Sequence, residues 1–281
     1  MAKAKSKKST ASYELMRDAF MEVETYEASL EKAREELHVH NAAVSAAGRK
    51  SPEAANALQQ ADTSRHNVNF LEAGLNDSQK GFEKTFLKDR KGLEAILGDK
   101  DVSKTLKNAV FAYEPVVSKG ASKKYQDAAK LHKQVGPMLA RYSAFRGKQL
   151  SKDQEESIFD DMARDIIADY VKSEKDPLYL RAFVELAGGV VQEDKDGKLK
   201  IAKDKDGNIA VASHDAANRQ FVALRYEGLV AEKQKKFMDL VEGNLPAYIA
   251  ATLPYKYEKA KGFYSQVINS VESKKQSKKK K

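Results

Sequence analysis

The chain has 281 residues, of which 41% are hydrophobic and 32% are charged, and its formal net charge is +9. The excess positive charge lies in two short segments, since residues 1–8 hold four lysines, residues 274–281 hold six, and neither holds an acidic residue. Without those ten lysines, 40 basic residues face 41 acidic ones, which leaves the body of the chain at −1. This distribution argues against a fold that binds nucleic acid over a uniformly basic surface.

The composition also limits the class of protein. The sequence contains no cysteine, which excludes disulfides and thiolate metal sites, and it has only six prolines and 15 glycines. Long helices with narrow apolar seams suit so charged a chain, whose mean hydropathy is −0.64. No run approaches the ~20 apolar residues of a membrane span, and the first residues lack the apolar core of a secretory signal. We therefore expect a cytoplasmic protein whose membrane contact is peripheral, with a nuclear location as the alternative.

The first third of the chain predicts a coiled-coil hairpin. Residues 1–10 are expected to form a disordered basic tail. Apolar residues recur every seven positions from Met16 to Val44, and again from Ala54 to Phe82. Between the two runs, Ser51-Pro52-Glu53 is a typical helix start, with a capping serine and proline at the first helical position. A short connection makes the second helix return antiparallel, so residues 11–98 predict a helical hairpin that closes within one chain or pairs with another.

The middle of the chain predicts shorter helices and one small β element. Residues 99–189 contain several helical runs that prolines and glycines interrupt. Residues 190–213 contain two near copies of one motif, Asp194-Lys-Asp-Gly and Asp204-Lys-Asp-Gly, each followed by alternating apolar residues. Because Asp-Gly favours tight turns between strands, this insert predicts a β-hairpin or a three-stranded meander.

The last part of the chain predicts another long helix. Apolar residues keep a three-four spacing over residues 214–272, across Pro246 and Pro254, so one long kinked helix is expected to pack on the bundle. Residues 273–281 are expected to be a disordered lysine tail. The predicted fold class is therefore mainly α: an elongated antiparallel helical bundle with a coiled-coil hairpin, a long kinked C-terminal helix and a small β insert.

Few residues have the spacing that catalysis or metal binding requires. The five histidines do not cluster, and His38 and His40 lie on different faces of their helix. The stretch from Asp204 to Asn208 shares residues with a calcium loop, but its glycine and its later carboxylate lack the EF-hand spacing. Asp161 and Asp165 are one helical turn apart and are expected on the solvated side of their helix. We therefore expect no enzymatic activity, no cofactor and no metal.

One segment carries a family resemblance. Asn244-Leu245-Pro246-Ala247-Tyr248-Ile249, followed by Phe263-Tyr264, resembles the closing helix of BAR domains, where a Leu-Pro kink precedes an aromatic pair. BAR domains are helical dimers that bind and curve membranes. The resemblance implies an elongated homodimer that acts as a non-enzymatic membrane-binding or curvature scaffold.

Electrostatic adhesion to an anionic membrane through the lysine segments and a basic helical face is therefore the expected mechanism. The alternative is a structural or assembly protein, such as a viral or cytoskeletal coiled-coil scaffold, whose lysine tails bind nucleic acid or an acidic protein. No small-molecule substrate is expected in either case. The candidate residues for binding a membrane or another polyanion are Lys3, Lys5, Lys7, Lys8, Lys84, Lys88, Arg90, Lys91, Lys123, Lys124, Lys130, Lys133, Lys274, Lys275, Lys278, Lys279, Lys280 and Lys281.

Overall fold

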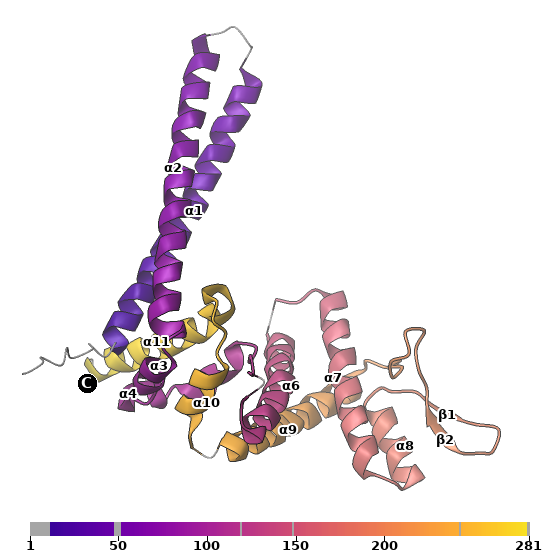
Figure 1. Ribbon diagram of the computed structural model, residues 1–281. Coiled ribbons are helices and arrows are strands. Elements are labelled where there is room, and N and C mark those ends of the chain that lie inside the picture. The colour runs from indigo at the N-terminus through magenta and orange to yellow at the C-terminus, as the bar shows by residue number, and fades with distance from the viewer. Residues whose placement is uncertain (1–11, 48–51, 119, 148, 242, 280–281) are drawn as a thin grey trace, which may run out of the picture. The chain divides into compact units, whose positions relative to one another are not determined.

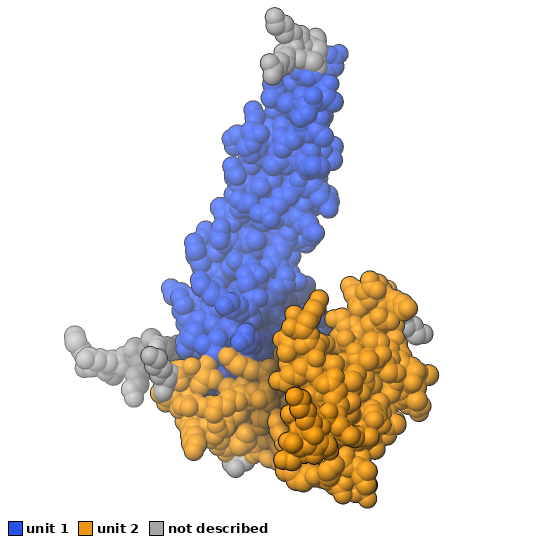
Figure 2. Space-filling model, turned by 90° about the vertical axis from the view of Figure 1, so that its right-hand side faces the viewer, with its two compact units in different colours: residues 1–116, 244–281 blue, residues 117–243 orange. Residues whose placement is uncertain are grey.

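The computed structural model describes residues 12–47, 52–118, 120–147, 149–241 and 243–279. Those residues form eleven α-helices, two short helices of other types and a two-stranded antiparallel sheet, so the protein is mainly α as predicted (Figure 1). The chain divides into two compact units, which Figure 2 shows in different colours. Unit 1 comprises residues 1–116 and 244–281, whereas unit 2 is the continuous stretch 117–243. The predicted segments were each continuous in the sequence, whereas unit 1 is formed by two separate stretches of the chain.

The predicted hairpin is present in unit 1 and closes within one chain. Helices α1 (Tyr13–Ala46) and α2 (Pro52–Phe82) pack along each other, as Figure 1 shows. The Ser12 hydroxyl accepts a hydrogen bond from the backbone N–H of Leu15 and so caps α1. Ser51, the capping residue predicted for the start of α2, lies outside the described residues. The buried residues of α1 follow the predicted seam. The residues that α1 buries are Tyr13, Met16, Phe20, Val23, Leu30 and Ala33.

Small residues of α2 allow the two hairpin helices to approach closely. A Cβ atom added to Gly74 would lie 2.5 Å from Cε1 of Tyr26 on α1, so the ring occupies its observed place because residue 74 has no side chain. Farther along the seam, His40 Nδ1 and Ser64 Oγ are 2.8 Å apart. The hairpin is therefore held by a narrow seam rather than by a broad core.

An aromatic cluster joins the base of the hairpin to the rest of unit 1. It contains Phe20 of α1, Phe82 of α2, Phe86, Tyr257 and Tyr264, with ring centroids 4.9–6.4 Å apart. Edge-on and tilted contacts of this kind stabilise a core beyond the burial of area alone. The other elements of unit 1 are the π-helix η1 (Glu83–Leu87), α3 (Arg90–Leu97), α4 (Lys100–Ser103), α5 (Leu106–Ala109), the 3-10 helix η2 (Val110–Ala112), α10 (Leu245–Thr252) and α11 (Tyr257–Lys279).

The single long helix predicted over residues 214–272 is wrong, because the structure has three helices there. Helix α9 (Ala216–Val241) belongs to unit 2, whereas α10 and α11 belong to unit 1. Gly243 has a φ of +72°, which breaks the helical backbone, and Pro246 lies in the first turn of α10, where its missing N–H costs nothing. Leu253 and Pro254 then separate α10 from α11. Helix α11 also continues to Lys279. The prediction of a disordered tail is therefore wrong for residues 273–279, which are helical.

Unit 2 is built around three long helices. Helix α9 packs on α6 and α7, and their contact buries Phe159, Ile167, Val222 and Tyr226. The Ser151 hydroxyl and the Gln154 side chain form a reciprocal capping box at the start of α7, which fixes where that helix begins. The helices of unit 2 besides α9 are α6 (Lys123–Arg146), α7 (Lys152–Ser173) and α8 (Pro177–Leu186).

The predicted β insert is a small antiparallel hairpin in unit 2. Strand β1 (Val191–Glu193) pairs with β2 (Leu199–Ile201), with Gln192 opposite Lys200. The segment after β2 adds two isolated bridges, Lys203 to Ile209 and Gly189 to Val211, instead of a third strand. The prediction of a small antiparallel hairpin is therefore confirmed.

Candidate functional site

The first turn of α1 and the last turns of α11 lie side by side in unit 1, where the indigo and yellow helices meet in Figure 1. The Tyr13 hydroxyl donates a 2.9 Å hydrogen bond to Glu272 Oε1. The Lys275 ammonium lies 4.7 Å from the centroid of the Tyr13 ring and 3.8 Å from Glu14 Oε1. The start of α1 and the end of α11, which contains lysines of the second lysine-rich segment, therefore lie together at one place, which we call the cationic end.

Glu272 is the centre of the polar contacts at the cationic end. Burial opposes its ionisation, but the hydrogen bonds from Tyr13 and Lys275 and the positive charges of Lys275 and Arg17 lower its pKa below the ordinary value. Burial, followed by the hydrogen bond to Glu272, raises the pKa of Tyr13. At neutral pH a neutral phenol therefore donates to a carboxylate, which is a charge-assisted hydrogen bond.

A pocket of about 190 Å³ lies between α4 and α11 at the cationic end, and we call it the lysine pocket. Four lysines and one aspartate line it, which gives it a net charge of +3. Lys104 Nζ and Lys278 Nζ each lie 3.9 Å from Asp101 Oδ1, beyond hydrogen-bond distance. The lining residues are Asp101, Lys104, Val271, Lys274, Lys275, Ser277 and Lys278.

The other predicted lysines of unit 1 lie elsewhere. Lys84 on η1, Lys88 and Lys91 are exposed but do not line the lysine pocket. Their exposure is compatible with contact to a polyanion. They also provide controls of equal charge within the same unit.

Arg90 is placed differently from the surface residue that was expected. Its Nη2 donates a 2.7 Å hydrogen bond to the carbonyl oxygen of Leu253, and its guanidinium stacks on the Tyr255 ring at 3.8 Å. Its Nε and Nη1 atoms are buried. Arg90 therefore holds α3 against the segment that follows α10, and it is not available to bind a membrane.

The four predicted lysines of residues 123–133 belong to unit 2. They lie on α6, where Lys123, Lys130 and Lys133 are exposed and Lys124 is half-buried. Lys130 Nζ lies 3.0 Å from Asp127 Oδ1, one turn earlier on the same helix. The candidate set is therefore divided between the two units.

Several candidate residues lie outside the part of the chain that the structure describes. They are Lys3, Lys5, Lys7, Lys8, Lys280 and Lys281, together with the side chain of Lys279.

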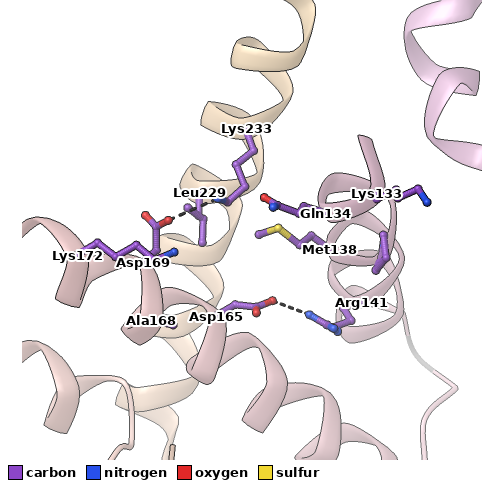
Figure 3. Close-up of a pocket in the computed structure, with 11 residues that line it drawn as sticks. Lys133, Gln134, Met138, Arg141, Asp165, Ala168, Asp169, Lys172, Leu229 and Lys233 are labelled. Carbon is purple, nitrogen blue, oxygen red and sulfur yellow. Dashed lines mark hydrogen bonds and ion pairs between the residues drawn. The ribbon is translucent and has the colours of Figure 1, made fainter. Parts of the chain in front are cut away.

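Unit 2 contains a polar pocket of about 330 Å³ between α6, α7 and α9 (Figure 3). On one wall, Arg141 Nη1 lies 2.5 Å from Asp165 Oδ2, and Tyr226 donates to the same oxygen at 3.2 Å. Burial, with Asp165 adding to it, raises the pKa of Tyr226 to about 12, so Tyr226 is a neutral donor. On another wall, Lys233 Nζ lies 3.5 Å from Asp169 Oδ1. These opposite charges satisfy one another, which is the arrangement of a structural ion-pair network.

The paired carboxylates noted in the sequence belong to that network. Asp161 and Asp165 both face Arg141, whose Nε lies 3.4 Å from Asp161 Oδ2. Asp160 instead lies 2.7 Å from His214 Nε2. Within the described ranges, no group of three or more histidines and carboxylates is arranged to hold a metal ion.

The two Asp-Lys-Asp-Gly copies adopt the same turn. Asp194 Oδ1 accepts 2.9 Å hydrogen bonds from the N–H groups of Asp196 and Lys198, and Asp204 Oδ1 does so from Asp206 and Asn208. The second oxygen of Asp194 faces Lys200 at 3.2 Å. That of Asp204 faces Arg164 at 3.1 Å. Both carboxylates are used in closing their own turns, which explains this motif without calcium.

Comparisons with known proteins add no family to this description. No protein family, no curated protein and no solved structure matches the chain. Among the described helices, none combines the length and apolar character that crossing a bilayer requires.

Sequence reasoning did not identify two parts of these sites. Lys104 was absent from the candidate set because its position in the sequence does not reveal that α4 packs on α11. Arg141 was also missed, since it lies 24 positions from Asp165. The aspartates at 161, 165 and 169, spaced by one turn, were the available signal that α7 faces cations.

Proposed function

We propose that this protein binds anionic membranes peripherally and without enzymatic chemistry, through the cationic end of unit 1. The observation that carries the proposal is the Tyr13–Glu272–Lys275 contact, which brings the start of α1 to the lysine-rich end of α11. The shaping of membranes, which the resemblance to BAR domains implies, stays a prediction.

The convergence of charge supplies the binding free energy. The two segments hold ten lysines, and each lysine near an anionic leaflet contributes about 1 kcal/mol. A lysine is attracted to an anionic leaflet when it lies within about one Debye length of the surface, which is about 8 Å at physiological ionic strength. Of these ten lysines, the structure describes the side chains of Lys274, Lys275 and Lys278, which lie together on the last turns of α11 and can act on the same part of an anionic surface.

Two features favour a membrane over a nucleic acid as the anionic surface. Both lysine-rich segments contain lysine but no arginine, and arginine is the side chain that reads bases and phosphates bidentately. Leu15, in the first turn of α1, exposes 52% of its surface. An exposed apolar side chain close to the end of a helix suits the boundary between lipid headgroups and acyl chains.

Co-sedimentation with vesicles tests the proposal. The full chain should sediment with vesicles containing phosphatidylserine, remain in solution with neutral phosphatidylcholine vesicles, and be released as salt is raised. Lys274→Gln combined with Lys278→Gln should weaken binding. Lys88→Gln combined with Lys91→Gln makes the same charge change at exposed positions of unit 1 and should have a smaller effect.

The same assay has an outcome that overturns the proposal. If the full chain fails to bind anionic vesicles but binds duplex DNA or RNA with a steep salt dependence, the protein is a nucleic-acid-binding assembly protein instead.

A further inference from the structure

We propose that the lysine pocket binds a phosphate monoester dianion, either as a lipid headgroup or as a free phosphate compound. The lipid form of this inference rests on the proposed membrane binding. The ligand class follows from the charge, the hydrogen-bonding capacity and the size of the pocket, which are considered in turn.

The pocket holds more positive charge than its own residues neutralise. Lys104 and Lys278 share one carboxylate oxygen of Asp101 at 3.9 Å each, a distance at which neither ammonium forms a hydrogen bond to it. Lys274 lines the same pocket, and no hydrogen bond or ion pair to its ammonium is seen among the described residues. Two ammonium groups therefore share a single carboxylate oxygen, and a third lysine without such a partner among the described residues lines the same pocket.

The hydrogen-bonding capacity of these groups matches a phosphate. An ammonium has three donors and no acceptor, and a phosphate monoester presents three acceptor oxygens and a charge near −2 at neutral pH. Lys104 approaches from the end of α4, and Lys274 and Lys278 are one turn apart on α11. Lys104 and Lys278, whose ammonium groups both lie 3.9 Å from Asp101 Oδ1, can therefore each donate to a different oxygen of one phosphate group, and Lys274 lines the same pocket. A carboxylate offers only two oxygens and one charge.

The size and position of the pocket favour a compact group over a polymer. The lysine pocket has a volume of about 190 Å³, and Val271 is the apolar residue among those that line it. Lys275 completes the wall but is already engaged by Glu272 at 3.4 Å and by the Tyr13 ring. Lysines near the end of α11 also interact favourably with the helix dipole, but that interaction does not require Lys104 of another helix.

Titration with inorganic phosphate, followed by amide NMR shifts of the full chain at constant ionic strength, tests the site. We expect saturable shifts at residues 101–104 and 271–278. Lys104→Gln and Lys278→Gln should each weaken phosphate binding at least threefold, and Lys107→Gln, an exposed lysine on α5, should leave it unchanged. Asp101→Asn should tighten phosphate binding about threefold or more. The substitution removes a negative charge that repels phosphate and that lies about 4 Å from the ammonium groups proposed to bind it. Unchanged phosphate affinity in the Lys104, Lys278 and Asp101 variants would overturn the inference, as would NMR shifts that occur only outside residues 101–104 and 271–278.

A vesicle arm separates the two sources of phosphate and the two proposals. Vesicles with phosphatidic acid, a phosphate monoester, are compared with phosphatidylserine vesicles of matched surface charge. A preference for phosphatidic acid that Lys104→Gln abolishes supports the lipid form. Equal binding to both lipids, together with no phosphate-induced shifts, contradicts the phosphate site while the proposed function stands. Phosphate binding in the pocket without binding to either vesicle supports the site for a free phosphate compound and contradicts the proposed function.

Discussion

The Tyr13 hydroxyl and the Glu272 carboxylate are 259 positions apart in the sequence and 2.9 Å apart in the structure. Their hydrogen bond ties the first turn of α1 to α11, and Arg17 adds an ion pair to the same carboxylate at 3.7 Å. The start of α1 and the lysine-rich end of α11, which are far apart in the sequence, therefore lie together in unit 1.

Acid should weaken unit 1 through Glu272. The folded state lowers the pKa of Glu272 below its ordinary value of 4.5. A carboxylate of this kind stabilises the fold above the unfolded pKa, and that contribution is lost as the pH falls through the lower folded pKa. Glu272→Gln should therefore reduce the loss of unfolding free energy between pH 7 and pH 3, measured by urea denaturation. Glu94→Gln, an exposed glutamate of α3, is the control, and equal pH dependence in both variants would contradict this role.

Two phenylalanines of α2 should respond very differently to truncation. Phe82 is 1% exposed within the aromatic cluster, whereas Phe70 is 70% exposed. Phe82→Ala leaves a cavity between α1, α2 and α11 and should cost about 3–5 kcal/mol of unfolding free energy. Phe70→Ala should change it by less than about 0.5 kcal/mol. Denaturant unfolding measures both, and similar losses would show that the cluster is not the core of unit 1.

Two glycines of α2 offer a second matched pair. A Cβ atom at Gly81 would meet nothing within 4 Å, so Gly81→Ala should stabilise the helix by about 0.5–1 kcal/mol. Gly74→Ala should gain less, because its Cβ atom would displace the Tyr26 ring. Thermal unfolding should rank Gly81→Ala above Gly74→Ala, and the reverse ranking would mean that Tyr26 does not pack on Gly74.

Local patterns predicted the parts of this fold that depend on local contacts. The seven-residue repeat predicted the α1–α2 hairpin, because Leu30 and Ala33 pack against Val68 of the next helix in the chain. The three-four spacing over residues 214–272 was misleading, since apolar periodicity continues across a break that Gly243 and Pro254 impose on the backbone. A periodic pattern reports which side chains are buried but not whether one helix carries them all.

The candidate sites depended on contacts that no sequence pattern encodes. The packing of α4 on α11 brings Lys104 and Lys278 to the same carboxylate of Asp101. The packing of α6 on α7 brings Arg141 to Asp165. The basic cluster in the sequence did not show that Lys88 is exposed whereas the Arg90 guanidinium stacks on the Tyr255 ring. Tertiary packing decides such cases.

The buried tyrosines should resist ionisation until the protein unfolds. Burial is the main cause of the raised pKa values of Tyr113, Tyr248, Tyr257 and Tyr264, and it raises that of Tyr226 to about 12. A raised phenol pKa stabilises the fold fully below the unfolded value of 10, and the contribution is lost as the pH rises through the folded pKa.

Absorbance at the tyrosinate band measures this directly, because the sequence has 12 tyrosines and no tryptophan. At pH 11 the folded protein should show fewer tyrosinates than the urea-unfolded protein, and the remainder should ionise together with alkaline unfolding. Full ionisation of all tyrosines without loss of helical circular dichroism would contradict the buried cluster.

The most direct test of the membrane-binding account asks which part of the protein touches the bilayer. Because the sequence has no cysteine, an environment-sensitive fluorophore can be placed at one introduced cysteine. Gln276→Cys labels an exposed position at the cationic end, and Ala42→Cys labels an exposed position of α1 about 43 Å along the helix from Tyr13. With anionic vesicles, the label at position 276 should shift its emission to the blue while the label at position 42 does not. No shift at position 276, or equal shifts at both positions, would contradict binding through the cationic end.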